Sequence, residues 1–221
     1  MTNPRFLQTA ERWKNPEVPE EKVGTQLPRD YAVQNLEGFI YIPSTKLYVA
    51  KERTHFGKNW DKAHELLASE NFSMQTLPEF VEFMKHIRTN DLDVYNEITQ
   101  VRNSWRAEWI DAYFEEREDG LYVLTKNKAK SEKLDKNTLR KKKGISLDSW
   151  IKDPTSQGLP RRNVAKGNLN FYPSINNSVA GFLADDGGAG LDCGRSLGSW
   201  NSLIWVRAVR RESDVLLADR K

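Results

Sequence analysis

The sequence has few of the residues that build disulfides and metal sites. It contains one cysteine, Cys193, and three histidines among 221 residues. A single cysteine excludes an intrachain disulfide and a zinc site made of several thiolates. No run approaches the roughly twenty apolar residues of a membrane-spanning helix, and residues 1–21 lack the basic and then apolar pattern of a signal peptide. We therefore expect a protein with no membrane span, whose cellular location the sequence does not specify.

The residues that are present suit a folded domain with a mixed surface. Seven Trp, nine Phe and seven Tyr can form a core, whereas 29% of the chain is charged. The formal net charge is only +3, with both signs interspersed. Such a balance implies no overall attraction to nucleic acid.

The order of the patterns predicts an α+β domain at 36–221, preceded by an irregular, proline-containing arm at 1–35. Apolar spacing predicts a hairpin and then three helices, with Asn59 as one cap and Thr76 with Glu79 as a capping box. A strand, a polar basic insertion at 126–144 and a short helix capped by Ser146 follow. The expected ranges are 39–51 for the hairpin, 59–71, 76–88 and 104–119 for the helices, 121–128 for the strand and 146–151 for the short helix. The remaining C-terminal part is glycine-rich and strand-like.

Familiar catalytic and cofactor motifs fit poorly. The stretch "DDGGAGLDCGRS" lacks the Lys-Ser/Thr of a phosphate-binding loop. His64 lies on the apolar stripe of its predicted helix and is interpreted as a packed core residue. Asp185, Asp186 and Asp192 match no calcium loop, and Cys193 alternates with apolar neighbours as a buried cysteine would. We expect no enzymatic activity, no cofactor and no metal.

Lys126–Lys143 is rich in Lys and Arg and could contact phosphates. It also holds Glu132 and Asp135 and has no interleaved aromatic residues for base stacking. The interpretation as a solvated loop is favoured over a nucleic-acid site, which remains an alternative.

A pattern of period two runs through the segment "SVAGFLADDGGAGLDCGRSLGSWNSLIWVRAV". Leu191 and Cys193 fall on one side of a predicted strand, and Gly190, Asp192 and Gly194 fall on the other. From 168 to 204 there is no Lys, Glu, Gln or Met. The second side has little bulk and poor strand propensity. We therefore predict an inward face that determines the fold and an outward face that tolerates exchange.

The same segment resembles the C-terminal variable region of proteins diversified by diversity-generating retroelements, in an archaeal or viral branch. The resemblance rests on the framework "SVAxFxAxxxxAxLxCxR" followed by "VRAV", and "GFIYIPSTKLYVAKERTHFGKNWDKAHELL", "LPEFVEF", "WRAEWIDAYFE" and "SLDSWIKDPTSQGLP" are also similar to this family. It implies a C-type lectin-like fold with a loop-rich antiparallel β region at its C-terminal end. In this family an error-prone reverse transcriptase replaces template adenines, and the accessible residues include Gly, Asp, Ser, Leu, Asn, Arg and Phe but exclude Lys, Glu, Gln, Met and Trp. Trp200, and Trp205 just before "VRAV", depart from that pattern.

The resemblance implies a non-catalytic display protein whose hypervariable segment, 178–207, binds a variable macromolecular ligand, expected to be a protein. The scaffold would comprise Val179, Phe182, Ala184, Ala189, Leu191, Cys193, Val206 and Arg207. Among bulky side chains near the variable positions, only Trp200 and Arg195 are of the types that dominate binding energy. The variable positions would be Gly181, Leu183, Asp185, Gly187, Gly188, Gly190, Asp192, Gly194, Ser196, Gly198, Ser199, Asn201 and Leu203.

One enzymatic alternative stays open, an oxidase of the formylglycine-generating type on the same fold. It would require reactive cysteine chemistry at Cys193. Nucleic-acid binding through Lys126–Lys143 is the other alternative.

Overall fold

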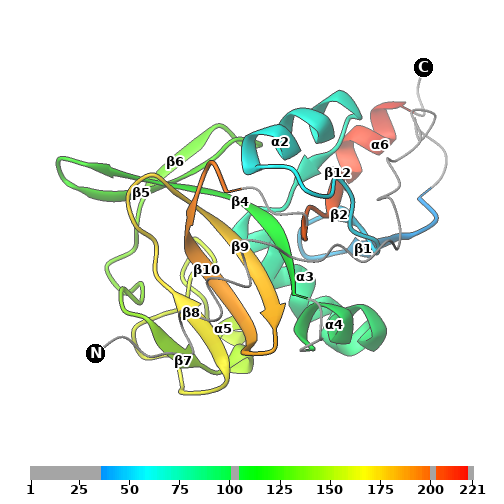
Figure 1. The fold of residues 1–221 in the computed structure, drawn as a ribbon. Helices are drawn as coiled ribbons and strands as arrows, with labels where there is room; N and C mark the ends of the chain where they lie inside the picture. The colour runs from blue at the N-terminus through cyan, green and yellow to red at the C-terminus, as the bar shows by residue number, and fades with distance from the viewer. Residues whose placement is uncertain (1–35, 101–104, 200–202, 219–221) are drawn as a thin grey trace.

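A computed structural model describes residues 36–100, 105–199 and 203–218, without side-chain detail at 216–218 (Figure 1). The predicted arm at 1–35, together with Trp200 and Asn201, lies outside the described residues. The chain contains helices and the strands of two β-sheets, so the predicted α+β class is confirmed.

The smaller sheet joins the two ends of the described chain. Strands β1 (Phe39–Ile42) and β2 (Leu47–Ala50) form the expected hairpin. β12 (Ala208–Arg211) pairs with β2 and with β3 (Ser73–Met74), giving the antiparallel order β1-β2-β12-β3. The segment "VRAV" therefore contributes to the same sheet as the N-terminal hairpin.

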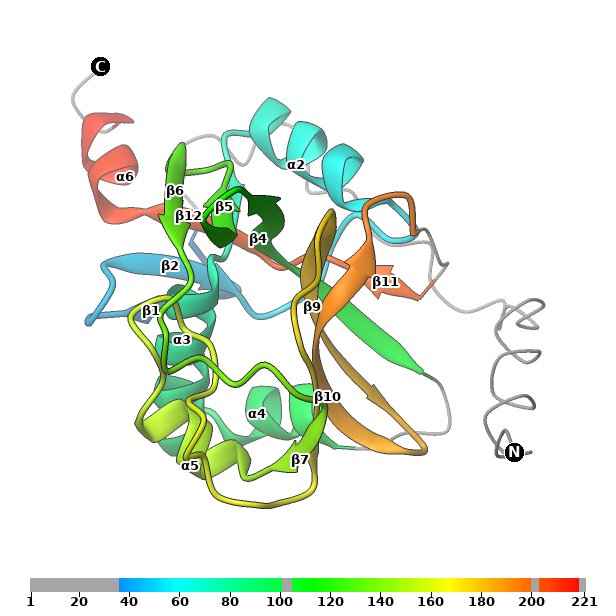
Figure 2. The ribbon, with the colours of Figure 1, turned by 90° about the vertical axis from the view of Figure 1, so that its left-hand side faces the viewer.

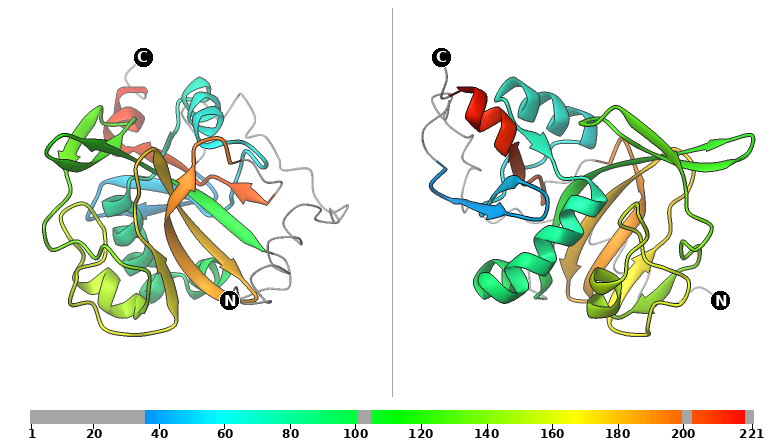
Figure 3. Two further views of the ribbon diagram at one scale, coloured as in Figure 1. Left: turned by 60° about the vertical axis from the view of Figure 1, so that its left-hand side comes forward. Right: turned by 180° about the vertical axis from the view of Figure 1, so that it is seen from behind.

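The larger sheet has eight strands and is mixed rather than antiparallel. Its order is β6-β5-β4-β9-β10-β8-β7, and β11 pairs with β4. β8–β10 and β4–β11 are parallel pairs, so the expected antiparallel C-terminal region is only partly correct. β5 and β6 lie at the end of the molecule opposite α4 (Figure 3). The strands are β4 (Arg106–Arg117), β5 (Gly120–Thr125), β6 (Lys130–Lys133), β7 (Lys143–Ile145), β8 (Leu169–Tyr172), β9 (Ser178–Asp185), β10 (Gly188–Ser196) and β11 (Ile204–Trp205).

The helices begin at the predicted caps. The side chain of Asn59 accepts a hydrogen bond from the backbone N–H of Lys62, Thr76 and Glu79 form a capping box, and Ser146 caps the short helix. The sequence patterns did not predict α4. Helices α3, α4 and α5 lie on one side of β9 and β10 (Figure 2). The helices are α2 (Trp60–Ser69), α3 (Leu77–Asn90), α4 (Leu92–Thr99), α5 (Leu147–Lys152) and α6 (Glu212–Ala218).

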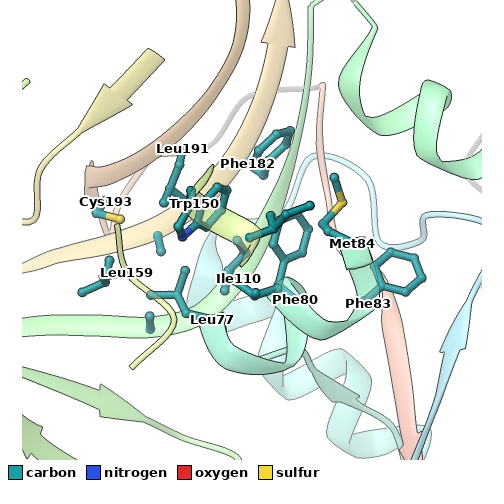
Figure 4. Close-up of a cluster of buried hydrophobic side chains, with 14 of the residues drawn as sticks. Leu77, Phe80, Phe83, Met84, Ile110, Trp150, Leu159, Phe182, Leu191 and Cys193 are labelled. Atoms are coloured by element: carbon teal, nitrogen blue, oxygen red, sulfur yellow. The ribbon is translucent and has the colours of Figure 1, made fainter. Parts of the chain in front are cut away.

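Two hydrophobic clusters enclose the middle of the larger sheet. The first packs α3 and α5 against one face, with Phe80, Trp150 and Phe182 among its members (Figure 4). The second packs α2 against the other face, and its members include Trp60 of α2 and Trp109 of β4. Strands β4 and β9 contribute side chains to both clusters, so both of their faces are covered.

One prediction for the middle of the chain is wrong, and a second is incomplete. The segment expected to form a helix at 104–119 instead contains strand β4. Its sequence lacks the alternation typical of a strand because both faces are buried and the register shifts between Ile110 and Tyr113. The expected solvated insertion at 126–144 contains β6 and the start of β7. Leu134 and Leu139 within it are buried in the first cluster.

Candidate ligand-binding surface

The β9–β10 hairpin carries most of the segment that the sequence singled out. Its strands are antiparallel, with Leu191 opposite Phe182 and Gly190 opposite Leu183. Phe182, Leu191 and Cys193 are all 0% exposed and point into the first cluster (Figure 4). Of the predicted scaffold, Ala189 alone is only partly buried; the others are buried, namely Val179, Phe182, Ala184, Leu191, Cys193, Val206 and Arg207.

The opposite face of the hairpin is also covered in its middle. Gly181 and Gly190 are buried, and Leu183 is only 6% exposed. Leu183 packs in the second cluster with Trp109 of β4. The expectation that Gly181, Leu183 and Gly190 form an exposed face is therefore wrong, because the sheet has a second core where the sequence pattern suggested solvent.

Arg195 lies across this covered face. Its guanidinium is 5.2 Å from the ring centroid of Trp105 and 5.8 Å from that of Trp109. Its Nε is 3.3 Å from Oδ2 of Asp192, and the two side chains are 8% and 21% exposed. Burial lowers the pKa of Arg195, and Asp192 opposes that effect. Arg195 thus packs inside the protein and does not present a free side chain to a partner.

Close approach of neighbouring backbone explains the glycines within the strands. A Cβ at Gly190 would lie 3.0 Å from the carbonyl oxygen of Asn170, and one at Gly181 would lie 3.1 Å from that of Glu108. At Gly194 the corresponding distance to the oxygen of Pro173 is 3.3 Å. Glycine permits such approach because it has no Cβ. A side chain at any of these positions would require the neighbouring backbone to shift by a few tenths of an ångström.

The solvent-accessible predicted positions cluster at the two ends of β10. Gly187 is exposed in the turn, and Asp185 and Gly188 are partly exposed. At the other end Ser196 and Gly198 are exposed, whereas Ser199 and Leu203 are partly exposed, as are Asp192 and Gly194 along the strand. Eight residue steps of about 3.3 Å place Ser196 roughly 26 Å from Gly188. The fully exposed positions therefore form two groups, with the partly exposed Asp192 and Gly194 between them.

We call the first group, Asp185 to Gly188 with the pocket beside it, the hairpin-tip surface. The pocket has a volume of about 410 Å³ and is bounded by Gly188 and Ala189 of the hairpin. Tyr95 of α4 lines it, and burial raises the pKa of Tyr95. The rest of the lining is both polar and apolar, with more apolar than polar surface, and comes from Thr99, Ser146, Leu147, Asp148, Lys166, Gly167, Asn168 and Leu169.

The turn itself has a defined conformation. The backbone N–H of Gly187 donates to Oδ1 of Asp185 at 2.8 Å, and Asn170 Nδ2 donates to the oxygen of Gly187 at 3.1 Å. Gly188 has a φ of +106°, which side-chain-bearing residues rarely adopt. The turn can therefore vary at Gly187 more readily than at Gly188.

Cys193 is enclosed in the first cluster. Burial raises the pKa of its thiol well above the ordinary value, and Asp192 adds to that shift. Nucleophilic cysteines have lowered pKa values and accessible sulfur atoms. The geometry does not suit the chemistry that the oxidase alternative requires.

His64 is buried on α2, as predicted. Its Nε2 lies 3.3 Å from Oδ1 of Asp111, whose carboxylate accepts hydrogen bonds from the backbone N–H groups of Lys126 and Asn127. Asp111 thereby fixes the start of the β5–β6 connection. Within residues 36–100, 105–199 and 203–218, no group of three or more His, Cys, Asp and Glu side chains is arranged to hold a metal ion.

A buried ion-pair network joins the two sheets to α4, and sequence reasoning missed it. Arg207 donates from Nε to Glu108 at 3.1 Å and from Nη2 to Glu97 at 2.8 Å. Arg53 and Arg106 contact the same carboxylates. Burial alone raises the pKa of Glu108, but the three arginines outweigh it and the pKa lies below its ordinary value. The one feature of the sequence that indicates this network is that Arg106 and Glu108 are two residues apart, which places them on the same face of β4.

Comparisons with protein-family models, curated proteins and solved structures found no match to the chain. In the part of the chain that the structure describes, no helix combines the length and apolarity needed to cross a membrane.

Proposed function

We propose that the chain is a non-catalytic binding protein that recognises a macromolecular ligand, a protein, through the hairpin-tip surface. In this proposal the α+β domain is a C-type lectin-like scaffold and the exposed turn is diversified by a retroelement, as the sequence resemblance implies. The segment 196–203 at the other end of β10 would form a second variable region.

One contrast along the hairpin supports the proposal most directly. Phe182, Leu191 and Cys193 are 0% exposed, whereas Asp186 and Gly187 are exposed next to a pocket of about 410 Å³. Substitutions at an exposed turn usually change stability by less than about 0.5 kcal/mol. A rigid hairpin with an exchangeable tip can therefore present different side chains without an ordering cost on binding.

The proposal narrows the variable surface that the sequence pattern suggested. Gly181, Leu183 and Gly190 are excluded because they are buried. Gly188 is restricted by its positive φ. Exchange would be concentrated at Asp185, Gly187, Ser196, Gly198, Ser199 and Leu203.

Two surface-display libraries test the recognition surface. One randomises Asp185, Asp186 and Gly187, and the matched control randomises Lys62, Glu65 and Ser69 on the exposed side of α2. Both are selected against the same set of purified proteins after sorting for folded clones. We expect specific binders mainly from the hairpin-tip library. An equal yield from both libraries, or none from the first, would contradict the proposed site.

The gene neighbourhood tests the diversification mechanism separately. We expect a nearby repeat of the 178–207 coding segment, rich in adenine at the exchangeable codons, together with a reverse-transcriptase gene. A complete genome without either feature would refute diversification by a retroelement. The display libraries would still test whether the hairpin-tip surface binds a protein.

A further inference from the structure

Two chain segments rich in Lys and Arg lie side by side at the edge of the larger sheet. The backbone N–H of Leu139 donates to the oxygen of Pro160, and that of Arg162 donates to the oxygen of Asn137, both at 2.8 Å. Farther along, Ser146 N–H donates to the oxygen of Ala165 at 2.8 Å. We call residues 135–145 and 158–167 together the basic patch. It includes β7, the last strand beyond β8 (Figure 1).

The basic patch is anchored in the core. Leu139 and Val164 are 8% and 6% exposed, and Leu159 is 0% exposed, all within the first cluster. Lys143 donates from Nζ to the oxygen of Val164 at 3.0 Å. The two segments therefore hold their charged side chains on an ordered backbone, in contrast to the solvated loop that the sequence suggested.

The patch concentrates positive charge far beyond that of the whole chain. Its two segments contain eight Lys and Arg residues and one carboxylate, Asp135, which gives a charge of +7. The whole chain carries +3, so the remainder is at −4. Arg161 is paired with Asp153 at 3.0 Å. The exposed cations are Lys136, Arg140, Lys141, Lys142, Arg162 and Lys166.

The patch composition favours phosphate over a protein partner. Protein–protein interfaces have apolar or aromatic centres and are depleted of Lys. Among the described residues, the large hydrophobic side chains that are exposed, Leu92 and Ile175, lie outside the patch. Nucleic-acid surfaces instead use dense Lys and Arg against the phosphate backbone. Lys142 Nζ lies 4.3 Å from the ring centroid of the partly exposed Tyr172, which places an aromatic ring beside the cations.

We propose that the basic patch binds the phosphodiester backbone of nucleic acid with little dependence on base sequence. This site adjoins the hairpin-tip surface, because Lys166 and Gly167 belong to the patch and also line the pocket, but phosphate binding by the patch does not depend on the proposed function. Cations that neutralise phosphates displace counterions, so binding weakens as salt rises.

Fluorescence anisotropy with a labelled 20-nucleotide oligo-dT and the full chain tests the proposal. If all six exposed cations contact phosphates, the slope of log K against log salt concentration is about −4, from about −0.7 per phosphate on a single strand. A duplex and an RNA oligonucleotide of the same length, measured in parallel, identify the preferred form. In the triple variant Arg140→Gln, Lys141→Gln and Arg162→Gln, we expect a slope of about −2, which is half as steep as that of the wild type.

The matched control removes the same charge elsewhere, through Lys51→Gln, Lys58→Gln and Lys62→Gln, at three exposed positions. We expect its slope to stay near that of the wild type. An absence of binding at 25 mM KCl would overturn the proposal, as would equal slope changes in the two triple variants. Competition by poly-glutamate as effective as that by oligo-dT at equal charge would instead indicate an acidic protein partner.

Discussion

At the scale of single residues, a glycine inside β10 and a glycine just beyond it differ in what surrounds them. Gly190 is buried, and its missing Cβ would lie 3.0 Å from the carbonyl oxygen of Asn170. Gly198 is exposed, and the nearest atom to its missing Cβ is Ser196 Oγ at 3.9 Å. The same amino acid thus meets a packing constraint inside the strand and none beyond it.

We therefore expect Gly190→Ala to lower the free energy of unfolding by about 1–3 kcal/mol, as overpacking usually does. Gly198→Ala should change it by less than about 0.5 kcal/mol. Urea unfolding of both variants measures the difference. Equal stabilities would show that the backbone of β8 shifts freely to admit the extra methyl group.

At the scale of secondary structure, the hairpin β9–β10 combines a buried face with exposed ends. Leu191 is 0% exposed in the core, whereas Leu92, at the start of α4, is 59% exposed. These residues allow the same substitution to be compared in two environments.

Leu191→Ala should lower the free energy of unfolding by about 2–5 kcal/mol, because it leaves a cavity in the first cluster. Leu92→Ala should change it by less than about 0.5 kcal/mol. Chemical denaturation followed by tryptophan fluorescence measures both values. If the Leu191 variant were as stable as the Leu92 variant, the hairpin would not be the rigid support that the proposed binding surface needs.

Local sequence patterns predicted the elements that bury side chains on one face only. The caps at Asn59, Thr76 and Ser146 lie where the sequence placed them, as do the inward positions of Leu191 and Cys193. Strand β4 was missed because residues on both of its faces are buried, so its apolar residues also fit a helical period.

The candidate site could be predicted only at its ends. The exposed turn at Gly187 follows from its composition, but the covering of Gly181 and Leu183 depends on Trp109, which is distant in sequence. Likewise, the basic patch needs Arg161 and Arg162 beside residues 135–145, and that pairing is a tertiary contact.

At the scale of the whole molecule, the ion-pair network links elements from distant parts of the chain. Glu108 belongs to β4 of the larger sheet, and Arg207 precedes β12 of the smaller one. Arg207 also donates to the oxygen of Ala50 at 3.2 Å, at the end of β2. The contact between the sheets therefore depends on charged groups as well as on the second cluster.

Glu108→Gln should lower the free energy of unfolding at pH 7 by about 3–5 kcal/mol, because it leaves buried arginines without their counter-charge. The pKa of Glu108 is lowered in the folded protein. Its contribution is therefore present above the ordinary glutamate pKa of about 4.3 and is lost as pH falls through the folded value.

The difference in stability between wild type and Glu108→Gln should thus shrink as pH is lowered from 5 toward 3. Urea unfolding at several pH values measures it. A difference that stays constant over this range would show that Glu108 does not ionise more readily in the folded state.

The enclosure of Cys193 has a practical consequence for work with this protein. The chain has no other cysteine, and this one is 0% exposed. A cysteine introduced at Gly187 or Ser196 would be the one thiol open to a maleimide reagent. Fluorophores or spin labels can then report on either end of the hairpin in the otherwise natural chain.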